Sequence, residues 1–395
     1  MAKSKLNIWY MIVAFVSCIP VVFYKNSILY KRIGYINIIT LLVLAVTVVN
    51  IILNYRSLFR NKYYISVLGI GGLLFLSDIV NECVNFSYMY RLARILIFTS
   101  TMLIATKGRK RNDYIKSNAL YFVASVLVNM GCQMIVPNGF SEITYTEWQP
   151  VYLIGAANSF IFYYLTAALF SIIYSITLKG KITSGCIVFI SMELISLLIG
   201  GSTAGFCSMC LFLLCICFSV SKRFSTFVSR HMKAIVGVIL LLFIVIIIWQ
   251  SPYITKMIIA VSGEEHSFSE RMYIWAQAVR KICEKPFFGY GTLNESIVYD
   301  FKGYLRTAHN TFLEIAILGG GLSLLVYVGS SIISLIRYSR FYRCTEQSEL
   351  HQTIYTIIIA FLCFVLIFMV EQNIYFPIFF SLIAFTGNLR YISSK

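Results

Sequence analysis

Residues 354–371 read IYTIIIAFLCFVLIFMVE and carry a single charged residue, Glu371, at their end. An apolar run of this length is typical of a membrane-spanning helix, because about 20 apolar residues are needed to cross the hydrocarbon core of a bilayer. Runs of the same kind recur along the whole chain, and we therefore predict about twelve spans. They fall near residues 6–24, 34–54, 63–80, 91–106, 118–136, 153–178, 182–199, 204–220, 234–250, 311–336, 354–371 and 374–388.

The composition of the 395-residue chain also indicates a membrane protein. Hydrophobic residues make up 59% of it and charged residues 12%, and its mean hydropathy is +0.80. A soluble protein is about 45–50% apolar, so an excess of this size requires lipid as the solvent. We predict an all-α, polytopic transmembrane helical bundle that forms a single integral membrane domain over residues 1–395.

The basic residues give the chain a net charge of +17, which by itself is compatible with a nucleic-acid partner. Their distribution argues against that function, because they form short clusters between the apolar runs. Cytoplasmic loops of membrane proteins are enriched in Lys and Arg, and placing both termini in the cytoplasm puts most of these clusters on that side. The sequence thus predicts a multi-pass membrane protein, with the lipid bilayer as a partner and no nucleic acid.

One connection between apolar runs, residues 251–310, is much longer than the others. In this orientation it is an extracytoplasmic loop, and a long loop in a compact chain is usually functional or disordered. Ser267 and Glu270 fit a capping box, and the apolar residues after them recur at helical spacing until Pro286. We predict an amphipathic helix over residues 268–283 that lies near the membrane surface. Its apolar positions are Met272, Trp275, Val279 and Ile282.

The sequence offers little support for metal or nucleotide chemistry. Cys207 and Cys210 form a C-x-x-C pair inside an apolar run with no histidine nearby, so we interpret them as small apolar residues of a helix. Cys283 is the only cysteine in the long loop, and we expect no structural disulfide. The inner loops contain no D-x-D pair and no P-loop, which argues against a nucleotide-sugar transferase and against ATP-driven transport.

His309 is the histidine whose position suggests chemistry. It lies where the long loop meets the next apolar run, within residues 308–314, and a neutral imidazole can accept a proton near physiological pH. The alternative is structural: the histidine caps the following helix, with help from Asn310 or Thr311. Position alone favours neither interpretation.

Several arginines near the same side of the membrane are candidates for binding phosphate groups. Arg91 and Arg94 lie one helical turn apart at the outer end of a span, where an arginine is costly and is a functional candidate. Two or three guanidinium groups together can hold a diphosphate. Arg91 and Arg94 can also pair with Asp78 or Glu82, and the two roles are compatible. Two rare acids of the membrane region are interpreted as internal salt-bridge partners: Glu193 and Glu371.

Four motifs follow one another in the second half of the chain. They are Arg271-x-x-x-Trp275-x-x-Ala278, Pro286-x-x-Gly289-x-Gly291, Ala308-His309-Asn310-x-x-Leu313 and the glycine cluster Gly319–Gly321. In this order, within a many-span protein, they resemble the O-antigen ligase and O-antigen polymerase (Wzy) family of bacterial membrane glycosyltransferases. The motifs cover the long loop, and the many-span architecture extends the resemblance to the rest of the chain.

The resemblance implies a GT-C-like fold and a metal-independent enzyme, without a cofactor, on the outer side of the bacterial plasma membrane. It implies a donor glycan carried on undecaprenyl diphosphate, with a chain-length regulator and a flippase as partner proteins. Carried over by position, His309 assists the acceptor hydroxyl and Arg271 holds the diphosphate, so these are the two predicted catalytic residues. The predicted substrate-binding residues are Arg91, Arg94, Arg306, Asn310, Glu314 and Arg280.

Three functions stay open at the level of the sequence. Polymerisation of a surface polysaccharide, O-antigen or capsule, is the preferred prediction. The first alternative is a ligase that moves the glycan to a lipid or protein acceptor. Ser323 and residues 201–204, which lack an arginine found in many members, depart from the ligase pattern. The second alternative is a non-enzymatic flippase for lipid-linked oligosaccharides, which does not need a long ordered outer loop.

Overall fold

The computed structural model describes residues 5–19, 35–84, 86–108, 110–140, 150–219, 221–249, 265–294, 296–345 and 347–389. Within these residues the protein is a bundle of helices with two short β-hairpins. The helices are α1 (Ile8–Ser17), α3 (Tyr35–Leu53), α4 (Tyr55–Phe59), α5 (Lys62–Val80), α6 (Phe86–Lys107), α7 (Arg111–Ile135), α8 (Ala157–Lys179), α9 (Ser184–Ile199), α10 (Thr203–Phe218), α11 (Lys222–Arg230), α12 (Met232–Phe243), α14 (Glu265–Glu284), α15 (Thr311–Cys344), α16 (Ser348–Phe368) and α17 (Pro377–Phe385). A π-helix (Ile244–Trp249) continues α12, and a 3-10 turn (Thr386–Asn388) follows α17. The hairpins pair β1 (Val151–Tyr152) with β2 (Gly155–Ala156) and β3 (Val298–Tyr299) with β4 (Leu305–Arg306).

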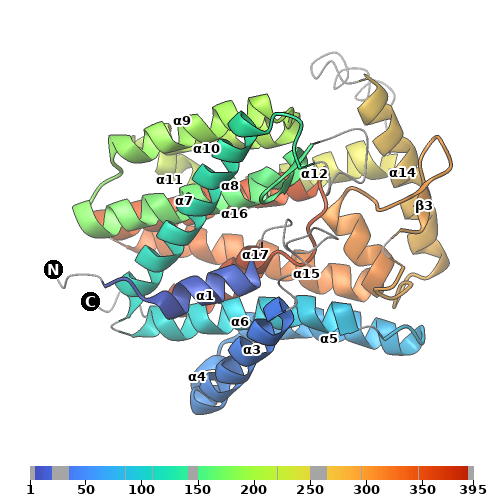
Figure 1. Cartoon of the computed structure of the whole chain (residues 1–395), viewed down its shortest axis with the longest axis horizontal. Coiled ribbons are helices and arrows are strands. Elements are labelled where there is room, and N and C mark those ends of the chain that lie inside the picture. The colour runs from blue at the N-terminus through green and yellow to red at the C-terminus, as the bar shows by residue number, and fades with distance from the viewer. Residues whose placement is uncertain are drawn as a thin grey trace.

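Many of the long helices run along one common direction, as Figure 1 shows. In the described part of the chain six helices are long and apolar enough to cross a membrane, namely α5, α6, α7, α8, α15 and α16. A seventh candidate is the pair α11–α12, whose halves are bent by 63°. The protein is therefore a polytopic α-helical membrane protein.

The twelve predicted apolar runs each contain a helix, but the prediction of about twelve spans is not confirmed. The apolar helices α1, α9, α10 and α17 are shorter than the six candidates, and so is the fully described part of α3, Ile38–Leu53. A helix of 16 residues such as α9 is about 24 Å long, whereas the hydrocarbon core of a bilayer is about 30 Å thick. Hydropathy measures how apolar a stretch of sequence is. A turn or bend within the stretch shortens the helix but leaves the hydropathy unchanged, so hydropathy alone overestimates the length of the helix.

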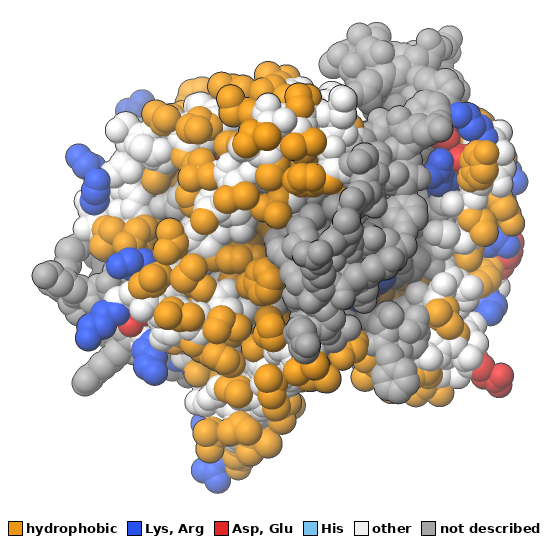
Figure 2. Space-filling model, in the orientation of Figure 1, with side chains coloured by type: hydrophobic (Ala, Val, Ile, Leu, Met, Phe, Trp, Pro, Cys, Tyr) orange, Lys and Arg blue, Asp and Glu red, His pale blue; other side chains and the backbone are white. Residues whose placement is uncertain are grey.

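The surface of the bundle fits a membrane environment. Figure 2 shows hydrophobic side chains across the middle of one face, and Lys and Arg side chains gathered toward its edges. Leu42, Leu241 and Leu325 are among many large apolar side chains that are exposed on the described helices. Lipid solvates such side chains favourably and water does not. Which end of the bundle faces the cytoplasm stays a prediction.

The interior is packed with aromatic side chains from the last three helices. The rings of Phe361 on α16 and Phe379 on α17 lie 4.8 Å apart, and the ring of Tyr327 on α15 lies 5.5 Å from that of Phe379. Edge-to-face and tilted ring pairs of this kind add to the stabilisation that comes from burial. The packing fixes α15, α16 and α17 relative to one another, and with them the loop that joins α16 to α17.

The predicted amphipathic helix is present as α14, and it is longer than residues 268–283 at both ends. Ser267 lies inside the helix, so the capping box predicted there is wrong, and residues 251–264 lie outside the described residues. Of its four predicted apolar positions, Trp275 is buried and the other three are half-buried, and α14 packs against α15. Figure 1 shows α14 crossing the end of the bundle at a steep angle to α8 and α16.

Helix α15 is broken at Gly320, where φ is 71° and ψ is −177°. In an unbroken helix the carbonyl of Ile317 would accept a hydrogen bond from the N–H of Gly321. Here the N–H of Tyr290 donates to the Ile317 carbonyl at 2.8 Å, and the N–H of Gly321 donates to the Pro286 carbonyl at 2.7 Å. The break thus replaces a hydrogen bond within the helix by two hydrogen bonds to the loop that follows α14.

Glycines make this contact sterically feasible. A Cβ atom on Gly289 would overlap the carbonyl oxygen of Ile317, and a Cβ atom on Gly320 would overlap the carbonyl of Phe287. Gly289 and Gly320 also have positive φ, a conformation that other residues adopt only with strain. The two glycine motifs of the sequence therefore meet in space, where they let two backbones pack directly against each other.

We expect Gly320→Ala to lower the free energy of unfolding by at least about 1–3 kcal/mol, because the alanine adds backbone strain and a clash with Phe287. Gly303→Ala is the matched control, since Gly303 has a φ of 80° in an exposed turn with no atom within 4 Å of an added Cβ. The measurement is thermal unfolding of the detergent-solubilised protein. Equal losses of stability in the two variants would show that the contact with the loop contributes nothing.

The predicted orientation is testable with two exposed cysteines at opposite ends of the bundle, Cys283 on α14 and Cys344 at the end of α15. A membrane-impermeant maleimide added to intact cells should label Cys283, and it should label Cys344 only after permeabilisation. Cys283→Ser is the control for the first signal. Labelling of Cys344 together with protection of Cys283 in intact cells would reverse the orientation.

Candidate active site

Arg271 and Trp275 lie one helical turn apart on α14. Trp275 is buried, and its Nε1 donates a hydrogen bond of 3.0 Å to the carbonyl of Ala308. Farther along the helix, Gln277 Nε2 donates to the carbonyl of Tyr299 at 2.7 Å, and Gln277 Oε1 accepts from the N–H of Tyr299 at 3.1 Å. These contacts fix α14 against the hairpin and the segment that lead into α15.

Arg306 lies on β4 and is oriented by an acid of its own hairpin. Its Nε donates to Asp300 Oδ2 at 2.9 Å. The carboxylate of Asp300 is buried, and its Oδ1 also accepts hydrogen bonds from the backbone N–H groups of Lys302 and Tyr304. A guanidinium has five N–H donors, so the contact with Asp300 positions Arg306 and leaves other donors for a ligand.

His309 has a left-handed backbone conformation, with a φ of 46°, which is uncommon for a residue other than glycine. The cap of α15 is the next residue, Asn310, whose Oδ1 accepts a hydrogen bond of 3.0 Å from the N–H of Leu313. Of the structural alternative, the part given to Asn310 is therefore confirmed, and the capping role given to His309 itself is wrong. The imidazole forms no hydrogen bond with a residue that the structure describes.

Two predicted substrate-binding residues, Asn310 and Glu314, support the backbone on either side of His309. Asn310 Nδ2 donates to the carbonyl of Met369 at 2.6 Å, and Glu314 Oε2 accepts a hydrogen bond of 2.8 Å from the N–H of Ala308. Both side chains are fully buried. These contacts hold the conformation of His309, and direct contact with a substrate stays a prediction.

Arg271 forms an ion pair with Glu371, with 3.0 Å between Nη2 and Oε1 and side chains that are 20% and 8% exposed. Thr311 ties the same loop to the start of α15, because its Oγ1 donates to the Glu371 carbonyl at 2.9 Å and accepts from the N–H of Asn373 at 3.0 Å. The prediction that Glu371 is an internal salt-bridge partner is confirmed. Glu193 is fully buried and forms no ion pair with a described residue, so the same prediction fails there.

The loop between α16 and α17 also reaches the arginines of α6. The guanidinium carbon of Arg91 lies 5.0 Å from the centre of the Tyr375 ring, and Tyr375 is four residues after Glu371. Arg94 lies one turn farther along α6 and is half-buried. The loop therefore contacts Arg91 on one side and Arg271 on the other, which places both at the same end of the bundle.

From the sequence, Asp78 is a candidate partner of the two α6 arginines, and Arg280 is a predicted substrate-binding residue. Both oxygens of Asp78 accept hydrogen bonds from Thr292, from its N–H at 2.6 Å and from its Oγ1 at 2.8 Å, so this acid fastens the loop after α14. Arg280 is exposed and lies nine residues after Arg271, which is a half turn around the helix at 100° per residue. Arg280 thus faces the opposite side of α14 from Arg271.

The electrostatics of the site centre on His309. Burial first, and then the positive charges of Arg271 and Arg306, lower the pKa of His309 to about 4. The imidazole is therefore neutral at physiological pH and has a lone pair that can accept a proton. At this end of the bundle an uncharged base lies within electrostatic range of two guanidinium groups, an arrangement suited to an anion with a reacting hydroxyl beside it.

Sequence reasoning missed Asp300 and Tyr375. Asp300 carried a usable signal, because Asp300 and Gly303 are turn-forming residues between two short β-branched or aromatic stretches, which indicates a hairpin that brings Asp300 to Arg306. Tyr375 carried none, since its contact joins α6 to a loop far away in the sequence. Among the described residues no group of three or more His, Cys, Asp or Glu side chains is placed to hold a metal ion.

The apolar helices and the cationic site at one end define a polytopic membrane protein with a candidate active site at the rim of its bundle. Residues 186–328 match the family model described as O-Antigen ligase, Wzy_C. The matched segment contains the four motifs, and it supports the O-antigen ligase and polymerase family predicted from them. It includes His309 and Arg271 and excludes Arg91 and Arg94. No curated protein matches the chain.

Proposed function

We propose that the protein is a glycosyltransferase that polymerises a bacterial surface polysaccharide on the outer side of the plasma membrane. In this proposal the donor is a glycan on undecaprenyl diphosphate, and the acceptor is a second lipid-linked repeat unit. The family match supports an O-antigen ligase or polymerase type of function. The observation that carries the proposal is that one end of the bundle brings His309 within electrostatic range of Arg271 and Arg306, each of which is positioned by an acid.

The arginines have the chemistry that a diphosphate leaving group requires. Arg271 and Arg306 each direct one side of the guanidinium to a carboxylate, of Glu371 and of Asp300, and each has further N–H donors. Donors fixed before the substrate arrives stabilise charge that develops in the transition state, at about 3 kcal/mol for each donor group. Arg91, linked to the same loop through Tyr375, is a further candidate for the lipid-side phosphate.

His309 supplies the base for the acceptor. The acceptor hydroxyl gives its proton to the imidazole, its oxygen forms a bond to the anomeric carbon of the donor, and the bond from that carbon to the diphosphate breaks. The lipid diphosphate leaves with the bonding electrons. Positioning of the two substrates contributes as well, because a hydroxyl held close to the reacting carbon needs no further ordering before it attacks.

A ligase reaction is the second candidate, because the matching family model is described as O-Antigen ligase. Its chemistry at the donor is the same, and only the acceptor differs, being a lipid or protein instead of a lipid-linked repeat. A flippase is the non-enzymatic alternative, and for it the neutral imidazole beside two arginines would have no catalytic use.

Replacement of the two central residues separates these functions. We expect His309→Ala and Arg271→Ala to slow transfer by on the order of 100-fold or more, through loss of the base and of a diphosphate donor. The measurement is a gel of the surface glycan from the native host. A polymerase variant should leave single repeat units in place of a ladder, whereas a ligase variant should leave a full ladder on the carrier lipid.

Lys281→Ala is the matched control, since Lys281 is a cation of the same helix that pairs with Glu284 on the exposed side. It should leave the glycan ladder unchanged. Membrane abundance of each variant, measured by immunoblot, separates a loss of activity from a loss of folded protein. A normal ladder in abundant His309→Ala and Arg271→Ala proteins would exclude the proposed mechanism.

The pH profile should depend on whether the donor is bound. In the free protein the pKa of His309 is about 4, and the bound diphosphate would offset the charges of Arg271 and Arg306 and raise that pKa. Because only the neutral base is active, the rate falls as the pH drops below the pKa. We therefore expect the acid limb of kcat, which reports the complex, at a higher pH than the acid limb of kcat/KM. Coincident limbs, measured with purified protein, would contradict this coupling.

A further inference from the structure

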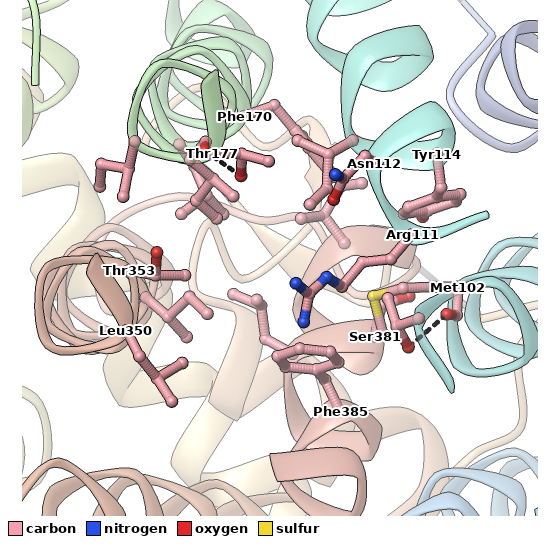
Figure 3. Close-up of a pocket in the computed structure, with 18 of the residues that line it drawn as sticks. Met102, Arg111, Asn112, Tyr114, Phe170, Thr177, Leu350, Thr353, Ser381 and Phe385 are labelled. Carbon is pink, nitrogen blue, oxygen red and sulfur yellow. Dashed lines mark hydrogen bonds between the residues drawn. The ribbon is translucent and has the colours of Figure 1, made fainter. Parts of the chain in front are cut away.

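A second site lies at the opposite ends of α15 and α16 from His309. A cavity of about 300 Å³ opens among α6, α7, α8, α16 and α17, and Figure 3 shows part of its lining. This volume is at the lower end of the range of about 300–1,000 Å³ that is usual for small-molecule sites. The lining is mainly apolar, with Phe98, Met102, Phe170, Ile357, Ile378 and Phe385 among its residues.

Arg111, the first residue of α7, is the cation of this cavity. Figure 3 shows its guanidinium extending between Leu350 and Thr353 on one side and Phe385 and Ser381 on the other. The side chain is half-buried, and its guanidinium forms no hydrogen bond or ion pair with any described residue. A charged group in largely apolar surroundings is unfavourable without a partner, so the cavity favours an anionic ligand.

Two charged residues near Arg111 in the sequence, Asp113 and Lys107, form contacts with other segments of the chain. The acid of the first turn of α7, Asp113, accepts a hydrogen bond of 2.6 Å from the N–H of Lys5. Lys107, at the end of α6, donates to the carbonyl and the hydroxyl of Ser57 at 3.0 and 2.7 Å. Asp113 and Lys107 are therefore engaged in other contacts. Arg111 is the basic residue of the lining of the cavity.

Glu349 is the acid of the lining, and it lies at the mouth. It is exposed, in the first turn of α16, and its Oε1 lies 3.1 Å from the place where a Cβ on Gly180 would be. Its carboxylate is thus turned toward the end of α8, where solvent screens its charge.

We propose that this cavity binds an anionic membrane phospholipid, with the phosphate on Arg111 and an acyl chain among the apolar residues of α6, α8 and α16. The cavity is enclosed largely by helices long and apolar enough to cross a membrane, and Arg111 is the first residue of one of them. The ends of membrane-spanning helices are where headgroups are expected. Basic pockets between membrane helices bind anionic headgroups in this way. A free phosphate would leave the apolar lining without a ligand, which favours a lipid.

The test measures lipid bound to protein that has been purified in detergent and stripped of lipid. Phosphatidylglycerol and phosphatidylcholine with identical acyl chains are titrated, and retained lipid is read by native mass spectrometry. Inorganic phosphate is a third ligand, read by the thermal unfolding midpoint. We expect phosphatidylglycerol to bind roughly tenfold or more tightly than phosphatidylcholine, because the choline cation beside the phosphate of the second lipid offsets its attraction to Arg111, and inorganic phosphate to leave the midpoint unchanged.

Three variants and one control variant test whether that preference arises from the cavity. Arg111→Ala should abolish the preference for phosphatidylglycerol and Arg111→Lys should retain part of it, whereas Arg60→Ala, an exposed arginine at the end of α4, should leave it unchanged. Thr353→Trp should weaken the binding of both lipids by filling the cavity while Arg111 stays in place.

Four results would overturn the proposal: equal affinity for the two lipids, an unchanged preference in Arg111→Ala, undiminished lipid binding in Thr353→Trp, or stabilisation by inorganic phosphate alone. The wild type and the Thr353→Trp and Arg111→Lys variants decide the question if Arg111→Ala does not fold. The binding measurement does not depend on glycosyl transfer, so its outcome is independent of the function proposed for His309.

Discussion

The break in α15 at Gly320 is the constraint on which the candidate site depends. It frees the Ile317 carbonyl for the N–H of Tyr290 and the N–H of Gly321 for the Pro286 carbonyl, so the loop after α14 becomes part of the helix's own hydrogen bonding. The first half of α15 is buried on all sides, and its direction is set at one end by this contact. At its other end Asn310 caps the helix and Trp275 of α14 holds the Ala308 carbonyl.

The ion pair between Arg271 and Glu371 has a different physical role. Both side chains are largely withdrawn from water, and the desolvation of two charges offsets most of their attraction, so such a pair contributes little net stability. What it provides is position, because Glu371 belongs to a loop that Thr311 binds directly to the start of α15. Arg271 is thereby held relative to His309 through a side chain from a third segment of the chain.

The sequence predicted the local features of this arrangement well and its long-range pairings poorly. Apolar runs of about 20 residues reveal helices because lipid exposure demands them, and the spacing of apolar residues around Trp275 predicted α14. Helix periodicity also contains the information that Arg280 faces away from Arg271, although the prediction grouped them. Arg271 and Glu371 are 100 positions apart, and nothing in either local sequence specifies the other.

The glycine motifs show which features the sequence predicts and which it does not. Pro286, Gly289 and Gly291 indicate a turn by their backbone preferences alone, and Gly319–Gly321 indicates a place where a helix can be interrupted. That the turn and the interruption bind each other follows from the packing of α14, α5 and α15, which is a property of the whole bundle. Ser77 of α5 completes the contact by donating to the Leu318 carbonyl at 2.6 Å.

Together these constraints explain how a histidine with a low pKa can act as a base in the proposed reaction. Without a bound donor, the charges of Arg271 and Arg306 lower the pKa of His309, because a protonated imidazole would be a third positive charge in a buried place. An anionic donor removes that penalty without any movement of the backbone, which the Gly320 contact and the Asn310 cap hold in place. Binding of the donor then strengthens the base that activates the acceptor, so one fixed arrangement of charges couples the two substrates in the proposed reaction.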